Sequence, residues 1–159
     1  MIFGAGHVGR ATAHLAKWLG FRVIVADDRS DLASADWIPE ADQYVTGSIN
    51  EQLDQININS QTYILSLTRG VMIDIETLPA LLNTDATYIG VIGSRRRWQT
   101  ALKQLREQGV SEEKLNRVHA PIGLELNAET PEEIATSIMA EVVMLKNKGS
   151  GKSMMTSDT

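Results

Sequence analysis

Cysteine is absent from the 159-residue sequence, and histidine occurs only at His7, His14 and His119. Without cysteine the chain can form neither a disulfide nor a thiolate metal site, and the three histidines are not spaced like metal ligands on one element. We therefore expect no metal held by the protein. The lack of cysteine also fits a reducing compartment, and we expect the cytoplasm.

Long apolar runs are missing as well. No apolar segment approaches the ~18 residues of a membrane span, and no basic segment precedes the apolar start at Met1. The net charge is -5, with 20 acidic against 15 basic side chains, so the chain lacks the positive field that attracts a nucleic-acid backbone. These absences predict a protein with neither a membrane nor a nucleic acid as its partner.

What the sequence does contain is an alternation of short β-branched segments with helical periodicity. Strands are predicted near residues 1–3 and at 21–27, 44–46, 63–67, 87–92 and 118–119, and helices at 7–19, 74–82, 95–108 and from 131 onward. Such alternation requires right-handed crossovers. The predicted fold class is α/β, a doubly wound and mainly parallel sheet with helices on both faces, over residues 1–148. Residues 149–159 lack periodicity and predict a disordered tail.

Helical spacing also predicts which side chains are buried. The buried stripes are expected to hold Val8, Ala11, Leu15 and Leu19 in the first helix and Ile134, Ile138, Val142 and Leu145 in the last. The last helix carries a clear start signal, a threonine cap at Thr130 followed by Pro131 and a glutamate at Glu133. Pro79 is expected to bend or shorten the helix at 74–82.

The strongest functional motif is Gly4-Ala5-Gly6-His7-Val8-Gly9, which fits G-x-G-x-x-G between a predicted strand and helix. The first glycine allows a tight turn, the second lets a pyrophosphate approach the backbone, and the third lets the helix pack on the strand. The free N–H groups and the positive end of the helix dipole then favour phosphate. The motif predicts a phosphate-binding loop at residues 4–9.

An acidic residue follows the second predicted strand. Asp27 lies 18 residues beyond Gly9, close to the offset of about 20 at which a carboxylate hydrogen-bonds the ribose of an adenine nucleotide. This spacing favours NAD over NADP. Arg29 can instead accommodate a 2′-phosphate, and Asp28 and Arg29 can equally be solvated loop charges. The residues therefore leave NADP open as an alternative ligand to NAD.

Three further segments are expected at the ligand-binding edge of the sheet. Gly93-Ser94-Arg95-Arg96-Arg97 follows the fifth strand and opens a helix, and the arginines there favour an anionic partner, with Arg97 equally well explained as a solvated residue. Thr68-Arg69-Gly70 follows the fourth strand and is either the floor of the same cleft or a plain turn. The loop from His119 through Pro121 adds a titratable ring.

Four segments of the sequence together point to a known family. They are Ile2-Phe3-Gly4-Ala5-Gly6-His7-Val8-Gly9, Val25-Ala26-Asp27-Asp28-Arg29, Tyr88-Ile89-Gly90-Val91-Ile92-Gly93-Ser94-Arg95-Arg96-Arg97 and His119-Ala120-Pro121-Ile122-Gly123-Leu124. In these segments the chain resembles the XdhC/CoxI family of xanthine dehydrogenase accessory factors. The resemblance runs from about residue 2 to residue 147 and covers the family's C-terminal Rossmann domain.

This resemblance implies a protein that binds and protects molybdenum cofactor, helps it acquire its terminal sulfur, and delivers it to xanthine dehydrogenase or a related molybdenum hydroxylase. The glycine loop and the Ser94-Arg95-Arg96 turn would then serve the phosphate of the pterin or its nucleotide extension. The family's cysteine-bearing N-terminal domain has no counterpart here, so it would belong to a separate chain or to a longer polypeptide. We also expect a homodimer.

Two other functions remain open from the residues. An NAD(P)-dependent oxidoreductase would need a proton relay, for which His119, Glu125 and Asp74 are the available groups. An NAD-sensing regulatory module would need only the glycine loop, and the second basic turn argues weakly against it.

Overall fold

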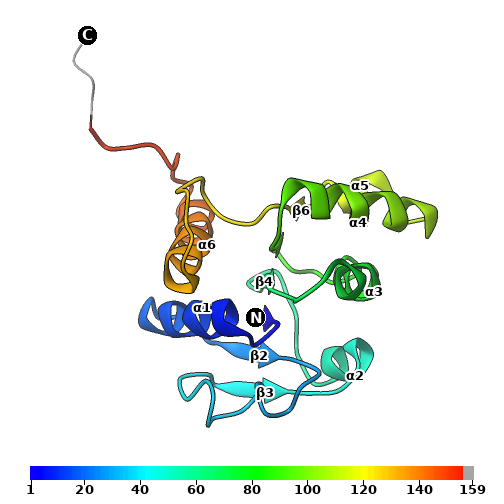
Figure 1. Ribbon diagram of the computed structural model, residues 1–159, viewed down its shortest axis with the longest axis horizontal. Coiled ribbons are helices and arrows are strands. Elements are labelled where there is room, and N and C mark those ends of the chain that lie inside the picture. Colours follow the sequence, from blue (N-terminus) through cyan, green and yellow to red (C-terminus); the bar gives the residue numbers. More distant parts are fainter. Residues whose placement is uncertain (156–159) are drawn as a thin grey trace.

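The computed structural model describes residues 1–155 and contains one parallel sheet between two layers of helices (Figure 1). The strands are β1 (Ile2–Phe3), β2 (Ile24–Ala26), β3 (Gln43–Val45), β4 (Tyr63–Ser66), β5 (Tyr88–Val91) and β6 (Val118–His119). The helices are α1 (His7–Trp18), α2 (Ile49–Asp54), α3 (Val71–Leu81), α4 (Arg95–Glu107), α5 (Glu112–Leu115) and α6 (Pro131–Lys146).

The six strands are ordered β3-β2-β1-β4-β5-β6, and every neighbouring pair is parallel. The order reverses between β1 and β4, which makes their carboxyl ends the switch point where ligands bind in sheets of this kind. The doubly wound α/β fold predicted from the sequence is confirmed. No helix within residues 1–155 combines the length and apolarity needed to cross a bilayer.

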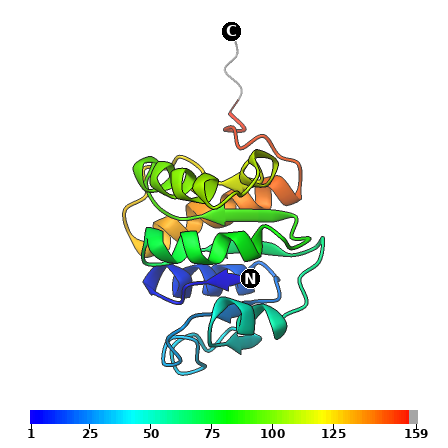
Figure 2. The same ribbon diagram turned by 90° about the vertical axis from the view of Figure 1, so that its right-hand side faces the viewer.

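A separate apolar core lies on each face of the sheet. α1 packs against α6 on one face, and α3 packs against α2 and α4 on the other (Figures 1 and 2). Ala13, Ala16, Ile138 and Val142 belong to the first core, whereas Leu78 and Leu105 belong to the second. Strands buried on both faces need near-continuous apolar sequence, which explains why β4 and β5 were predictable.

Several local predictions were wrong. Leu19 and Leu145 are 40% and 38% exposed, because each lies at the end of its helix beyond the packed part. The buried face of α1 consists of small residues, Gly9, Thr12, Ala13 and Ala16, which allow α6 to approach closely.

Two helices also differ from the prediction. The short helix α2 was not predicted, and α3 starts three residues early, directly after Gly70. α3 continues past Pro79 to Leu81, since the proline lies in its last turn and the Leu82 N–H still donates to the Leu78 carbonyl at 2.8 Å. Residues 149–155 form no helix or strand, and the rest of the predicted tail, 156–159, lies outside the described residues.

Candidate functional site

The glycines of the loop at 4–9 differ in what surrounds them. A Cβ at Gly4 would lie 2.4 Å from the Leu67 carbonyl oxygen, and its φ of +98° also favours glycine. A Cβ at Gly9 would lie 2.1 Å from the Gly4 carbonyl oxygen, so this glycine lets α1 pack on the loop. Gly6 has an ordinary φ of -67°, and a Cβ there would meet nothing within 4 Å. Its missing side chain therefore leaves open space beside the loop.

Two helices, α1 and α3, begin at the switch point without a side-chain cap at their N-termini. Gly6 is the N-cap of α1 and Gly70 is the N-cap of α3, and neither helix has a capping hydrogen bond from a side chain. A Cβ at Gly70 would likewise meet nothing within 4 Å. Because the first N–H groups of a helix have no partner inside it, these two ends present hydrogen-bond donors beside the adjacent strands β1 and β4.

Asp27 is almost fully buried and its carboxylate is already engaged within the protein. Oδ2 accepts the Ala5 N–H at 2.7 Å, and Oδ1 accepts the Arg29 N–H at 3.0 Å. The Arg29 guanidinium donates to both oxygens at 2.9 Å. Asp27 therefore ties the end of β2 to the glycine loop, and contact with a ribose stays a prediction.

Trp37 supports the same loop and was missed from the sequence. Its indole N–H donates to the Ala5 carbonyl at 2.7 Å, and its ring meets His7 edge to face at 5.5 Å. The Arg10 guanidinium lies 4.5 Å from the centre of the same ring, close enough for a cation–π contact. The sequence signal for this role was a large aromatic residue in the otherwise mostly polar connection between β2 and β3.

An ion pair joins the loops that follow β2 and β4. The Arg69 guanidinium donates to both oxygens of Asp28 at 2.8 and 2.9 Å, and it holds the pKa of that carboxyl well below its usual range. Both side chains are exposed and line a cleft of about 110 Å³, together with Gly4. The pair thus spans the switch point on the side of α2 and α3.

Thr68, beside Arg69, belongs to a buried structural cluster. Its hydroxyl donates to Asp74 Oδ1 and accepts from Arg97, whose Nε donates to Asp74 Oδ2 at 2.8 Å. Burial raises the pKa of Asp74, while the bonds from Thr68 and Arg97 oppose that rise. The Ser94 hydroxyl caps α4 by accepting the Arg97 N–H at 3.1 Å. A Cβ at Gly93 would meet the Arg97 side chain at 2.6 Å.

A second hollow lies beyond β5 and β6. Its volume is about 450 Å³, and Gly93, Arg95 and Pro121 are among the residues that line it. The Arg95 side chain supplies a positive charge at this hollow, whereas Arg96 is exposed but does not line it. Both arginines lie at the start of α4, after the carboxyl end of β5, but only Arg95 lines the hollow, and a role in ligand binding stays a prediction.

His119 lies on β6 and pairs with Glu141, a buried carboxylate on α6 that was not predicted as a site residue. Its Nδ1 is 3.3 Å from Glu141 Oε1, while Glu141 Oε2 accepts the Tyr88 hydroxyl and the Gly123 N–H, each at 2.7 Å. Burial raises the pKa of Glu141, but these hydrogen bonds outweigh it and hold that pKa below its ordinary value. The signal was a glutamate within the apolar stripe of the last helix.

The structure thus brings the predicted residues together in two groups along the carboxyl edge of the sheet. The first joins Gly4 and Ala5 of the glycine loop with residues 27–29, Thr68 and Arg69, and the second joins Gly93, Arg95 and Pro121. Asp74 accepts a hydrogen bond from the Thr68 hydroxyl, His119 pairs with Glu141, and Glu125 accepts the Asn127 N–H at 3.1 Å. The three groups expected for a proton relay are therefore not assembled in one cluster.

A sequence model of the family described as XdhC Rossmann domain matches residues 1–142. The chain belongs to the XdhC Rossmann-domain family. It is 37% identical over 98% of its length to the "Uncharacterized protein YqeB" of Escherichia coli, covering 28% of that protein. It is 29% identical over 93% of its length to a probable xanthine dehydrogenase subunit of Bacillus subtilis, covering 43% of that protein.

Two further relatives carry informative names. The "Molybdenum cofactor insertion chaperone PaoD" of Escherichia coli is 26% identical over 92% of this XdhC-family chain, which covers 39% of it. A crystal structure of a "xanthine dehydrogenase" from Bacillus halodurans superposes with a TM-score of 0.78 at 30% identity, with 92% of this chain and 43% of that chain covered. The chain therefore spans less than half the length of each of these relatives.

Proposed function

We propose that this XdhC-family domain binds the phosphate-bearing part of molybdenum cofactor and serves in its delivery to an enzyme of the xanthine dehydrogenase type. Gly6 carries the proposal. Internal contacts explain Gly4 and Gly9, but neither packing nor backbone conformation requires glycine at position 6. Open space beside an uncapped helix N-terminus suits a ligand phosphate.

The chain's own groups suit such a ligand in three ways. The first N–H groups of α1 and α3 are donors for phosphate oxygens, Arg69 lines the cleft at the switch point, and Arg95 lines the neighbouring hollow. Asp27 and Trp37 stabilise the conformation of the glycine loop through their hydrogen bonds to the Ala5 backbone. The bound cofactor would supply the molybdenum chemistry of the client enzyme, and this domain would orient and shield it.

The names of two relatives support the same assignment. One is a molybdenum cofactor insertion chaperone and another is a probable xanthine dehydrogenase subunit. The proposal includes help with sulfuration of the cofactor, a molybdenum hydroxylase as client, and a cysteine-bearing domain supplied by a separate chain or a longer polypeptide. The working unit in this proposal is a homodimer in the cytoplasm.

Calorimetry of the purified chain against molybdenum cofactor, NAD and NADP tests the proposal. We expect molybdenum cofactor to bind more tightly than either dinucleotide, and Gly6→Ser to weaken that binding at least about tenfold, because the new side chain caps the helix and fills the open space. Gly149→Ser is the matched control, since its Cβ would meet only ordinary contacts at 3.7 Å. Tight NAD binding with redox turnover would instead identify an oxidoreductase.

A further inference from the structure

Arg29 covers the carboxylate that was predicted to contact a ribose. A carboxylate offers about four acceptor positions, two on each oxygen. Oδ1 of Asp27 accepts the Arg29 backbone N–H at 3.0 Å and the Arg29 Nε–H at 2.9 Å. Oδ2 accepts the Ala5 N–H at 2.7 Å and the Arg29 Nη2–H at 2.9 Å. The protein itself therefore fills every acceptor position of Asp27.

A ribose binds such a carboxylate by donating hydrogen bonds from its hydroxyl groups, so it needs free acceptor positions. On Asp27, Arg29 alone fills three of these positions. The Asp27 side chain is 1% exposed whereas that of Arg29 is 38% exposed, so the guanidinium lies between the carboxylate and solvent. A nucleotide could reach Asp27 only by displacing this guanidinium from its buried partner, which is costly.

The loop after β2 holds Arg29 in this position. The Arg29 N–H binds the carboxylate two residues earlier, as in an Asx turn. The Arg29 carbonyl accepts the N–H groups of Leu32 and Ala33, each at 3.1 Å. Both polar groups of the Arg29 backbone are therefore engaged, and the side chain has only to turn back along its own loop. Local contacts thus specify the closure of Asp27.

The space beside Asp27 is small. The cleft at the switch point has a volume of about 110 Å³, and Asp27, Asp28, Arg29 and residues 47–49 at the start of α2 are part of its lining. Pockets that enclose a whole small molecule measure roughly 300–1,000 Å³, so this cleft has room for a phosphate group but not for a nucleoside. Glu76 lines it as well, and the negative charges of Asp28 and Glu76 oppose a phosphate attached to the ribose.

We propose that Arg29 selects the class of ligand at this site. It closes the ribose position at the end of β2, so the cleft takes a phosphomonoester rather than an adenine dinucleotide. The phosphate binds at the open helix ends that begin at Gly6 and Gly70, and Asp27 contacts no ribose. This inference rests on the proposed function, because it requires a phosphate at the glycine loop. It gives a physical reason for NAD to bind poorly to a loop that carries the G-x-G-x-x-G motif.

Calorimetry with ADP and 2′,3′-dideoxy-ADP tests the closure, because the two nucleotides differ only in the ribose hydroxyls. The wild-type chain should bind both equally weakly, through their phosphates alone. Arg29→Ala frees one acceptor position on each oxygen of Asp27, so this variant should bind ADP at least about tenfold more tightly than the dideoxy analogue. A wild-type chain that already prefers ADP by about tenfold, or an Arg29→Ala variant without any preference, would overturn the proposal.

A second variant separates the closure from a loss of fold or charge. Arg29→Lys keeps a positive charge beside the buried carboxylate, but one ammonium group cannot reproduce the two-pronged contact of the guanidinium. A preference for ADP of about threefold should therefore appear. Denaturant unfolding checks that each variant is folded. If Arg29→Ala is not, Arg29→Lys decides the question, and equal binding of the two nucleotides to it would refute the proposal.

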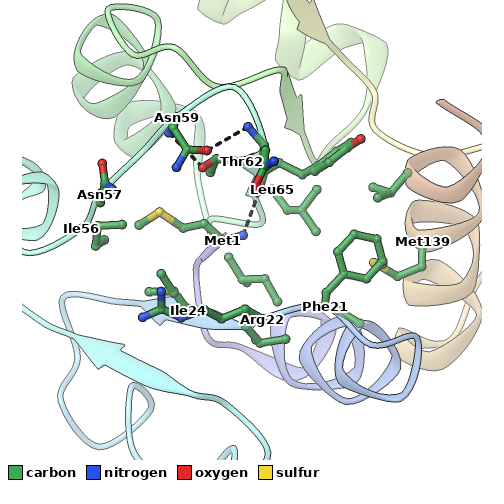
Figure 3. A pocket seen from close by; sticks show the side chains of 16 residues that line it. Met1, Phe21, Arg22, Ile24, Ile56, Asn57, Asn59, Thr62, Leu65 and Met139 are labelled. Carbon is green, nitrogen blue, oxygen red and sulfur yellow. Dashed lines mark hydrogen bonds between the residues drawn. The ribbon is translucent and has the colours of Figure 1, made fainter. Parts of the chain in front are cut away.

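Arg22→Ala is the matched control, because it removes the same side chain near the other end of β2. Arg22 lines a cavity of about 260 Å³ where the strands begin, and Figure 3 shows it there with Phe21 and Ile24. This variant should bind ADP and the dideoxy analogue with equal affinity, as the wild-type chain does. A preference for ADP in Arg22→Ala would show that the effect does not depend on Asp27, which would overturn the proposal.

The opposite role for Arg29 is recognition of a 2′-phosphate, as in NADP. Adenosine 2′,5′-bisphosphate and AMP differ only in that group, and the wild-type chain should bind the bisphosphate no more tightly than AMP. A preference of about tenfold for the bisphosphate that Arg29→Ala abolishes would overturn the proposal. These nucleotide tests are independent of the cofactor: they can fail while Gly6→Ser still weakens cofactor binding, whereas unchanged cofactor binding in Gly6→Ser would count against the proposed function itself.

Discussion

The helix N-termini of this fold fall into two kinds. Ser94, Ser111 and Thr130 cap α4, α5 and α6 by accepting a backbone N–H, and at α2 the Glu51 carboxylate reaches back to the Ser48 N–H at 2.7 Å. α1 and α3 begin instead at Gly6 and Gly70, with no side-chain cap. These two helices follow β1 and β4, the strands that flank the switch point.

We interpret this difference as a separation between helix ends that serve folding and helix ends that serve the proposed ligand. A polar cap satisfies N–H groups that would otherwise lack a partner, and it stabilises a helix by about 1 kcal/mol. Where a helix end serves only the fold, this sequence supplies such a cap. At the switch point both helix ends lack such a cap, which suits the anionic ligand that we propose.

The largest effect is expected where glycine holds an uncapped end in place. Gly9→Ala puts a Cβ 2.1 Å from the Gly4 carbonyl oxygen, so the loop or α1 must move, and we expect a loss of about 3 kcal/mol of unfolding free energy in a denaturant titration. Gly6→Ala, whose Cβ meets nothing within 4 Å, is the control and should lose less than about 1 kcal/mol. Equal losses would remove the distinction between the two glycines.

Capping the second open end should exchange binding for stability. Gly70→Ser gives α3 a side-chain acceptor, so we expect a gain of roughly 0.5 kcal/mol in unfolding free energy and a loss of about tenfold in molybdenum cofactor affinity by calorimetry. The backbone of Gly70 is extended and accepts any residue. A variant that gains stability without losing affinity would restrict the anion site to α1.

The opposite change at a closed end should affect stability alone. Thr130→Ala removes the cap of α6 and should lower the unfolding free energy by about 1 kcal/mol with no change in cofactor affinity. Hydrogen bonds from the Glu129 and Thr130 N–H groups lower the pKa of Glu133, so the capping-box contribution should also fade as the pH drops below about 4.5. A change of cofactor affinity in Thr130→Ala would contradict the proposed separation between capped helix ends, which serve folding, and uncapped ends, which serve the ligand.

Local signals predicted the fold well and the site only in part. The motif at 4–9 and the cap at Thr130 act through neighbouring residues, so sequence spacing was enough to recognise them. The spacing after Gly9 predicted a ribose contact for Asp27, directly after β2, but it could not reveal the partners Ala5 and Arg29, which are set by the folded loop.

Long-range contacts account for most of what the sequence did not reveal. Trp37 reaches Ala5 across 32 positions and Glu141 reaches Tyr88 across 53, and no local periodicity encodes either pairing. The helix α2 was overlooked because its six residues hold too little periodicity to be recognised.

The smallest effect is expected at the ion pair across the switch point. Asp28→Asn removes a negative charge beside the proposed phosphate site and releases Arg69, so cofactor affinity should rise about two- to fivefold at low salt. Stability should hardly change, because exposed ion pairs contribute little to it. Asp31→Asn, a charge change on the exposed loop after β2, is the control and should leave affinity unchanged. A drop in affinity for Asp28→Asn would mean that the Asp28 carboxylate itself contacts the ligand. The ligand at the open ends of α1 and α3 would then have to carry a hydrogen-bond donor as well as a negative charge.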